Sequence, residues 1–169
     1  IDLDLRRPRL AEYLKVEKES GISNYLIGQV SFNDIIIPVC NNLFDFLPSG
    51  PIPPNPSELV ASGKLEEMLA ELKKNYDIII LDSPPIGMVS DAMFISRVSG
   101  FMLLVVRHNI THKHLLSLLL EDLDRNQMRG LNLVYNDVPA GKKGYYRYGS
   151  RYGYYYQKEH KGFFNKWFD

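Results

Sequence analysis

The sequence predicts an α/β fold in which helices flank a doubly wound, mostly parallel sheet. Three unbroken apolar runs, residues 78–81, 101–106 and 131–135, are typical of strands that are buried on both faces. Helical patterns alternate with these runs, and alternation of strand and helix is what builds such a sheet. Ligands of these sheets bind beyond the carboxyl ends of the strands, so the functional residues are expected there.

The remaining elements follow from local signals. Residues 1–5 and 43–47 are candidates for two further strands. Leucines recur at helical spacing in 57–76 and 111–128, with Ser57 and Thr111 as the expected N-caps. The stretch PSGPIPPNP at 48–56 is too rich in proline for helix or strand and is predicted to be a fixed loop that leads into the first helix.

Composition limits the class of protein. A chain of 169 residues suits one domain, and its formal net charge of zero gives no case for nucleic acid or a membrane surface. A single cysteine, Cys40, excludes an intramolecular disulfide, and its apolar neighbours predict a buried thiol in the cytoplasm. No apolar run approaches the roughly 18 residues that a bilayer span requires. The abrupt start in IDLDLRRP is interpreted as the end of a strand, so the chain is taken as a fragment.

Two segments differ in composition. Residues 1–139 are expected to form the folded domain, whereas 140–169 combine glycine and tyrosine with few aliphatic side chains and are predicted to be a flexible tail. The tail contains seven basic and two acidic residues, which gives it a charge of +5 and leaves −5 on the rest. Seven of the eleven tyrosines lie in the tail: Tyr145, Tyr146, Tyr148, Tyr152, Tyr154, Tyr155 and Tyr156.

Acidic residues gather at two predicted strand ends. Asp2, Asp4 and Arg6 alternate along the chain, so a strand would carry them on one face. Two such carboxylates repel each other unless a cation, a proton or Arg6 offsets them, and magnesium with phosphate would do so. The alternative is a solvated strand end with an ion pair between Asp4 and Arg6.

Asp82 ends the run YDIIILD, in the manner of a Walker B acid. A buried strand fixes the backbone there, and the next carboxylate points toward a metal. The alternative is an aspartate that caps a helix or belongs to a turn. Two acidic strand ends in one α/β pattern favour a site for metal and phosphate.

A family resemblance rests on the series IDLDLRRP, GISNYLIG, LFDFLPSGPIPPNPSELVAS, YDIIILDSPP and SDA together with the tyrosine cluster. The chain resembles, over essentially its whole length, the catalytic domain of the bacterial tyrosine kinases (BY-kinases) that regulate capsule and exopolysaccharide export. These are deviant P-loop proteins unrelated to eukaryotic kinases. The resemblance implies an autokinase that uses ATP and Mg²⁺ to phosphorylate its own tyrosine tail in trans.

The resemblance also implies partners and a location. It implies a homo-oligomer, a ring or a dimer, in which the tail of one subunit reaches the active site of its neighbour. It further implies a transmembrane polysaccharide co-polymerase as activator, fused or separate, and a protein-tyrosine phosphatase, but no nucleic acid. The expected location is the cytoplasm at the inner face of the cell membrane.

Roles carry over at matching positions only. Asp2 and Asp4 match the acids of the second Walker motif, A′, which makes Asp2 the base and a residue of the metal's shell and Asp4 a second residue of that shell. Asp82 matches the Walker B acid and is the expected magnesium anchor. The departure is that no GxxxxGK[ST] sequence occurs among the 169 residues. The chain alone is therefore expected to bind ATP poorly, and the motif is expected upstream of Ile1.

Three other polar residues are weaker candidates. Asn136 follows a predicted strand where related ATPases place an asparagine that contacts adenine, and a polar strand end is the alternative. Arg107 ends another strand and is a candidate to face the nucleotide, with a surface ion pair as the alternative. Asp91 is expected to cap a helix rather than to touch the water shell of the metal.

Two rival functions remain open. Tyrosine interleaved with Arg and Gly also suits stacking on single-stranded RNA or self-association, but that interpretation leaves IDLDLRR and IIILDSPP without a purpose. A partitioning ATPase of the ParA or MinD type has a similar site but does not need the tyrosines. Phosphotyrosine on the native protein would separate all three functions.

Overall fold

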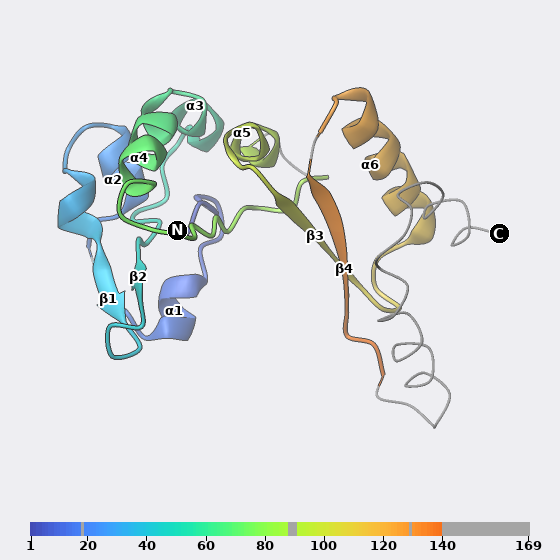
Figure 1. Ribbon diagram of the computed structural model, residues 1–169, viewed down its shortest axis with the longest axis horizontal. Coiled ribbons are helices and arrows are strands. Elements are labelled where there is room, and N and C mark those ends of the chain that lie inside the picture. Colours follow the sequence, from blue (N-terminus) through green and yellow to red (C-terminus); the bar gives the residue numbers. More distant parts are fainter. Residues whose placement is uncertain (18, 88–90, 129, 140–169) are drawn as a thin grey trace. The chain divides into compact units, whose positions relative to one another are not determined.

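The computed structural model describes residues 1–17, 19–87, 91–128 and 130–139 (Figure 1). The tyrosine tail, residues 140–169, lies outside the described residues. The chain divides into two units: Ile1–Leu104 with His112–Leu133, and Val105–Thr111 with the residues from Val134 on. The elements, in order, are α1 (Leu10–Leu14), α2 (Ile22–Leu26), the 3₁₀ helix η1 (Phe32–Ile35), β1 (Ile37–Val39), β2 (Phe44–Phe46), α3 (Pro56–Val60), α4 (Lys64–Leu72), α5 (Asp91–Val98), β3 (Met102–Arg107), α6 (Lys113–Arg125) and β4 (Leu131–Asn136).

One hydrophobic core organises the first unit. Helix α4 contributes a buried stripe, because Leu65, Met68, Leu69 and Leu72 recur at helical spacing. Helix α3 packs against α2 and α5 above this core (Figure 1). The segment that carries the predicted acids enters the same core through its alternate residues, the fully buried Leu3 and Leu5.

Main-chain pairing locks this segment from two sides. Asp2 N donates to Leu47 O at 3.0 Å on one side, and Leu3 N donates to Asp82 O at 2.8 Å on the other. The second contact belongs to a parallel bridge between Asp2 and Asp82. The predicted strands 1–5 and 78–81 are thus represented by a single bridge rather than by continuous ladders. The bridge still brings the two acidic ends together.

The predicted burial of strand 78–81 on both faces is wrong for this chain. Ile79 and Leu81 pack against the core, whereas Ile78 and Ile80 are 79% and 75% exposed. A strand is buried on both faces only where a layer covers each of them. The described residues cover only the face with Ile79 and Leu81.

The predicted strands 101–106 and 131–135 are found as β3 and β4, within one residue at each end. Their predicted burial on both faces is wrong, because Leu103 and Val105 of β3 are exposed, as are Leu133 and Val134 of β4. The two strands pair in a two-stranded sheet. Met102 N donates to Gly130 O, and His108 N donates to Asn136 O, so the partners advance together and the strands run parallel. Helix α6 makes the crossover that a parallel pair requires.

Strand β2 coincides with the predicted run 43–47, but its antiparallel partner β1 has no counterpart among the predictions. The hairpin turns through Cys40, Asn41 and Asn42, whose φ angles of 52°, 58° and 61° are all left-handed. Cys40 is exposed at this turn, so the predicted buried thiol is wrong. The sharp reversal of the chain directs the side chain outward in spite of its apolar neighbours.

Both predicted helices need correction. The expected helix 57–76 is two helices, α3 and α4, because the chain turns at Gly63, whose φ is 80°. Asn55 rather than Ser57 occupies the N-cap position of α3. The expected helix 111–128 is the shorter α6, and Thr111 Oγ1 instead accepts a hydrogen bond from Arg107 N at 2.9 Å.

Candidate active site: an acid cluster at two neighbouring segment ends

Asp2 is a fully buried carboxylate in the first unit. Its Oδ1 accepts a hydrogen bond from Asp4 N at 3.3 Å, whereas its Oδ2 is buried without any hydrogen-bond partner among the described residues. Leaving a buried acceptor unsatisfied costs about 1–3 kcal/mol, and more for a charged group. A proton or a cation is the kind of partner that would satisfy this oxygen.

Burial raises the pKa of Asp2 to about 6. The hydrogen bond from Asp4 N–H opposes this shift, whereas the nearby charges of Asp82 and Asp4 add to it. Burial, followed by the charge of Asp4, also raises the pKa of Asp82. A carboxylate with a pKa slightly below neutral is ionised at physiological pH and yet basic enough to accept a proton.

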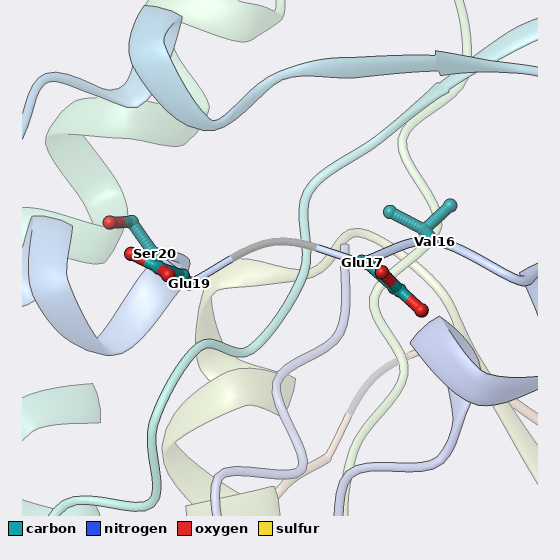
Figure 2. A pocket seen from close by; sticks show the side chains of 4 residues that line it. All are labelled: Val16, Glu17, Glu19 and Ser20. Carbon is teal, nitrogen blue, oxygen red and sulfur yellow. The ribbon is translucent and has the colours of Figure 1, made fainter.

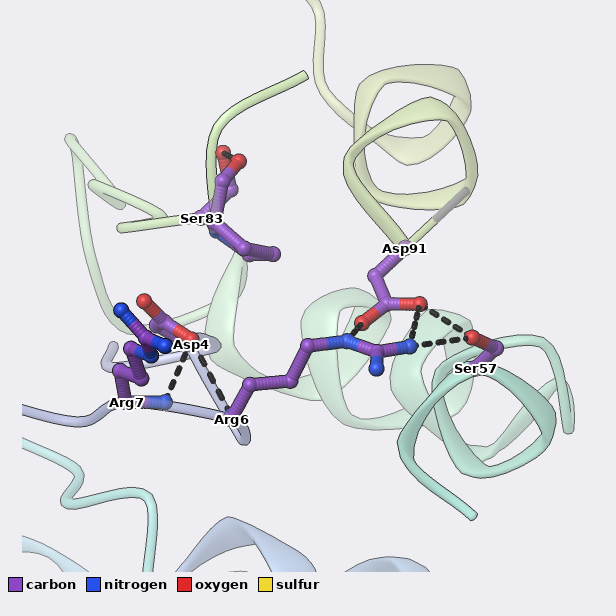
Figure 3. Close-up of polar contacts among 7 residues, drawn as sticks. Asp4, Arg6, Arg7, Ser57, Ser83 and Asp91 are labelled. Carbon is purple, nitrogen blue, oxygen red and sulfur yellow. Dashed lines mark hydrogen bonds and ion pairs between the residues drawn. The ribbon is translucent and has the colours of Figure 1, made fainter. Parts of the chain in front are cut away.

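The main chain orients Asp4. Its Oδ1 accepts hydrogen bonds from the N–H groups of Arg6 at 3.1 Å and Arg7 at 3.0 Å (Figure 3). A short aspartate side chain often closes a turn in this way. The turn holds the carboxylate in one orientation close to Asp2.

The Arg6 side chain reaches away from the Asp4 carboxylate, as Figure 3 shows. Its Nε donates to Asp91 Oδ2 at 2.7 Å, and its Nη2 donates to Asp91 Oδ1 at 3.2 Å and to Ser57 Oγ at 2.9 Å. The Ser57 hydroxyl in turn donates to Asp91 Oδ1. The alternative of an ion pair between Asp4 and Arg6 is therefore wrong, because the guanidinium is engaged by Asp91.

Asp91 opens α5 and is only 1% exposed. Burial opposes its ionisation, but the hydrogen bonds from Arg6 and Ser57 prevail and hold the pKa of Asp91 below its ordinary value. The predicted role as a helix cap stays a prediction, because residues 88–90, which precede α5, lie outside the described residues. No signal in the sequence identifies the pairing, because its partners come from three separate segments.

The donor set fits magnesium with a phosphate better than a metal centre built from protein alone. Among the described residues, no group of three or more His, Cys, Asp or Glu side chains is arranged to hold a metal ion. Magnesium usually binds one or two carboxylates and completes its shell with water and substrate phosphates. Asp4 and Asp82, beside the unsatisfied Oδ2 of Asp2, meet that requirement.

Arg107 and Asn136 belong to the second unit. Arg107 Nη2 forms an exposed ion pair with Asp137 Oδ2 at 2.9 Å, as the alternative interpretation expects. Asn136 Oδ1 accepts a hydrogen bond from Asp137 N at 2.8 Å. A nucleotide contact by either residue stays a prediction, and the seven predicted acceptor tyrosines lie outside the described residues.

A surface hollow on the connection between α1 and α2 is a poor candidate for a nucleotide site (Figure 2). Its lining residues are Val16, Glu17, Glu19 and Ser20. The two carboxylates among its described lining residues would repel a triphosphate. The hollow is therefore not assigned to the active site.

Comparison with known proteins identifies the family. No family model matches the chain. The tyrosine-protein kinase Wzc of Salmonella typhimurium is 32% identical over 161 residues, which are 95% of this chain and 22% of that protein. The putative tyrosine-protein kinase CapB of Staphylococcus aureus is 34% identical over 151 residues, 88% of this chain and 66% of that protein. The chain thus spans only part of the relatives that it matches.

Solved structures agree. The kinase domain of the Escherichia coli tyrosine kinase ETK superposes with a TM-score of 0.78 and 32% identity, over 84% of this chain and 56% of that domain. The chimeric protein CapA2B2 gives a TM-score of 0.76 at 32% identity, over 82% and 61%. These structures confirm the predicted α/β fold class. The chain belongs to the bacterial tyrosine kinase (BY-kinase) family.

Proposed function

We propose that this chain is the acid-bearing part of an ATP-dependent protein-tyrosine autokinase. The observation that carries the proposal is the parallel bridge between Asp2 and Asp82, which joins a buried carboxylate with an unsatisfied oxygen to a second acid. Relatives that are named tyrosine-protein kinases support it. Phosphoryl transfer requires positioning and charge neutralisation more than covalent help, and an acid cluster supplies both when a metal is bound.

In this mechanism Asp4 and Asp82 would hold Mg²⁺. The metal would neutralise charge on the phosphates of ATP. A bond forms between the tyrosine oxygen and the γ-phosphorus while the bond from that phosphorus to the oxygen bridging to the β-phosphate breaks. Asp2 accepts the proton of the tyrosine hydroxyl, a group whose ordinary pKa is about 10.

The phosphate-binding loop is proposed to come from outside these 169 residues. No GxxxxGK[ST] motif occurs within them. The ETK kinase domain is longer than the part that this chain matches, which leaves room for such a loop in a complete domain. The exposed Ile78 and Ile80 are consistent with a further layer of the complete domain. The chain alone should then bind ATP far more weakly than the complete domain does.

The acceptors are proposed to be the seven tail tyrosines, and transfer is proposed to occur between subunits of a homo-oligomer. The opposite charges of the tail, +5, and the rest of the chain, −5, support such an encounter. Each phosphate would add about −1.5 to −2 charges and weaken the attraction. Capsule or exopolysaccharide export is the proposed process, with a transmembrane co-polymerase as activator and a phosphatase as antagonist.

The proposed location is the cytoplasmic side of the cell membrane, reached through that activator. Among the described residues, no helix is both long and apolar enough to cross a bilayer.

The direct test is to incubate the complete kinase with ATP and to map phosphotyrosine by mass spectrometry, with and without Mg²⁺. The proposal predicts magnesium-dependent phosphate on tyrosines within 145–156. A protein that hydrolyses ATP without modifying tyrosine would instead support a partitioning-type ATPase.

A further inference from the structure

We propose that Arg6 is a positioning residue, anchored by Asp91 and Ser57, that holds the turn on which the Asp4 carboxylate is mounted. The inference rests on the proposed kinase function and adds a residue that neither holds the metal nor accepts the proton. It also assigns a role to the Ser57 hydroxyl of the PPNPSEL block.

The guanidinium is fixed at three points. Both oxygens of Asp91 and the hydroxyl of Ser57 engage it, at distances between 2.7 and 3.2 Å. A planar guanidinium held by a carboxylate through two hydrogen bonds has one defined orientation, which a single ammonium contact would not impose. The Arg6 side chain is thus immobilised by groups on α3 and α5.

This anchor is connected to the acids through the main chain. The N–H of Arg6 donates to Asp4 Oδ1, as does the N–H of Arg7. Asp4 N in turn donates to Asp2 Oδ1. A continuous series of hydrogen bonds therefore runs from buried Asp91 through Arg6 and Asp4 to Asp2.

The ion pair between Arg6 and Asp91 is better suited to orienting the turn at Asp4 than to stabilising the fold. Asp91 is buried whereas Arg6 is partly exposed, and an ion pair with a buried partner often contributes little net stability, because desolvation of the charge offsets the attraction. Here the pair ties the Asp4 turn to α5, the helix that follows the segment ending in Asp82. It also ties both to α3 through Ser57. The distance between the two acidic segment ends is thereby fixed from outside the site.

The test uses the complete kinase and three variants: Arg6→Ala, Arg6→Lys and Ser57→Ala. Arg125→Ala is the matched control, because Arg125 forms an exposed ion pair with Glu121 on α6. Four quantities are measured: the melting temperature without ligand, the Mg²⁺-dependent rise of that temperature in the presence of ADP, kcat, and KM for ATP. The second quantity reports on the geometry of the site without any turnover.

We expect Arg6→Ala to lower kcat at least about tenfold, since misplacing a catalytic group by about 1 Å can cost about 10²-fold. The Mg²⁺-dependent rise should shrink as well, while KM for ATP changes less than kcat. Arg6→Lys should restore the melting temperature of the unmodified kinase but not its kcat. Lysine keeps the positive charge but lacks the planar guanidinium that forms two hydrogen bonds with one carboxylate. Arg125→Ala should leave all four quantities unchanged.

A lower melting temperature with unchanged kcat and an unchanged Mg²⁺-dependent rise would make Arg6 merely structural and overturn the inference. If Arg6→Ala does not fold, Ser57→Ala decides, since it keeps the ion pair and removes only the hydroxyl. A fall of kcat in Ser57→Ala at near-normal melting temperature supports the inference, and an unchanged kcat overturns it. Failure of the proposed function is a separate result, in which the unmodified kinase itself forms no phosphotyrosine.

Discussion

Asp2 and Asp82 are joined by a parallel main-chain bridge, although nearly half of the chain separates them. Leu3 N donates to Asp82 O and Asp82 N donates to Ile1 O, at 2.8 and 2.9 Å. Both aspartates therefore lie at the same edge of the paired segments. The carboxylates repel each other there, and a bound cation relieves that repulsion.

The pH dependence of the kinase should reflect Asp2. Its pKa is raised to about 6, so the carboxylate loses its proton, and gains the capacity to accept one, as pH rises through that value. We expect kcat/KM for ATP to increase through about pH 6 and then level off, with the midpoint moving lower at higher Mg²⁺. Initial rates between about pH 5 and about pH 8 measure this. If kcat/KM of Asp2→Asn rises with pH in the same way, a group other than Asp2 controls this rise.

Asp91 should stabilise the fold in a pH-dependent way. Its pKa is lowered in the folded state, so its contribution is complete above the ordinary value of 3.8 and is lost as pH falls through the lower folded value. Asp91→Asn should reduce the free energy of unfolding at neutral pH by about 1–2 kcal/mol, because Arg6 is partly solvated. Urea titrations should show the difference shrinking below about pH 4. An equal loss in the exposed control Asp124→Asn would contradict this explanation.

Leu3 should link the core to the site. It is fully buried and lies between Asp2 and Asp4 in the sequence, and Leu→Ala changes at such positions cost about 2–5 kcal/mol. We expect Leu3→Ala to lower the free energy of unfolding by that amount and to slow phosphorylation as Asp2 and Asp4 shift. Leu43→Ala is the control, since Leu43 is 80% exposed and should change little. Similar losses of stability and phosphorylation rate in Leu3→Ala and Leu43→Ala would show that burial of Leu3 does not position the acids.

Transfer between subunits can be tested by mixing two complete kinases. One carries Asp82→Ala, and the other has phenylalanine in place of every tyrosine in 145–156. Phosphate should appear on the tail of the Asp82→Ala subunit, and less of it at high salt, because the Debye length falls from about 10 Å at 0.1 M to about 3 Å at 1 M. If neither is labelled while the unmodified kinase labels itself well, transfer occurs within one chain.

Several features of the site were predictable from short sequence patterns. Asp2, Asp4 and Asp82 each belong to or directly follow an apolar run, and parallel segments bring such ends to one edge. The partner of Arg6 was not predictable. A local rule pairs it with Asp4, two residues away, whereas the fold pairs it with Asp91 by bringing α3, α5 and the turn at Asp4 together.

The fold shows the same limit. The strands β3 and β4 were predictable because their apolar runs are long. Strand β1 was missed because it has only three residues and because the turn after it begins with Cys40, which is not a typical turn residue. The predicted burial of Ile78 and Ile80 is wrong, because an apolar run indicates only that its side chains are suited to burial by a neighbouring layer. What covers it depends on tertiary structure.

The most direct test of the account compares Asp82→Ala with Asp77→Ala in the complete kinase. Both changes remove an exposed acid from one short segment, but Asp82 is bridged to Asp2 whereas Asp77 takes no part in that bridge. The measurement is the initial rate of Mg²⁺-dependent tyrosine phosphorylation, with melting temperatures to confirm folding. We expect Asp82→Ala to abolish the reaction and Asp77→Ala to leave it near normal. Near-normal phosphorylation by a folded Asp82→Ala kinase would contradict the account and reduce Asp82 to a turn residue.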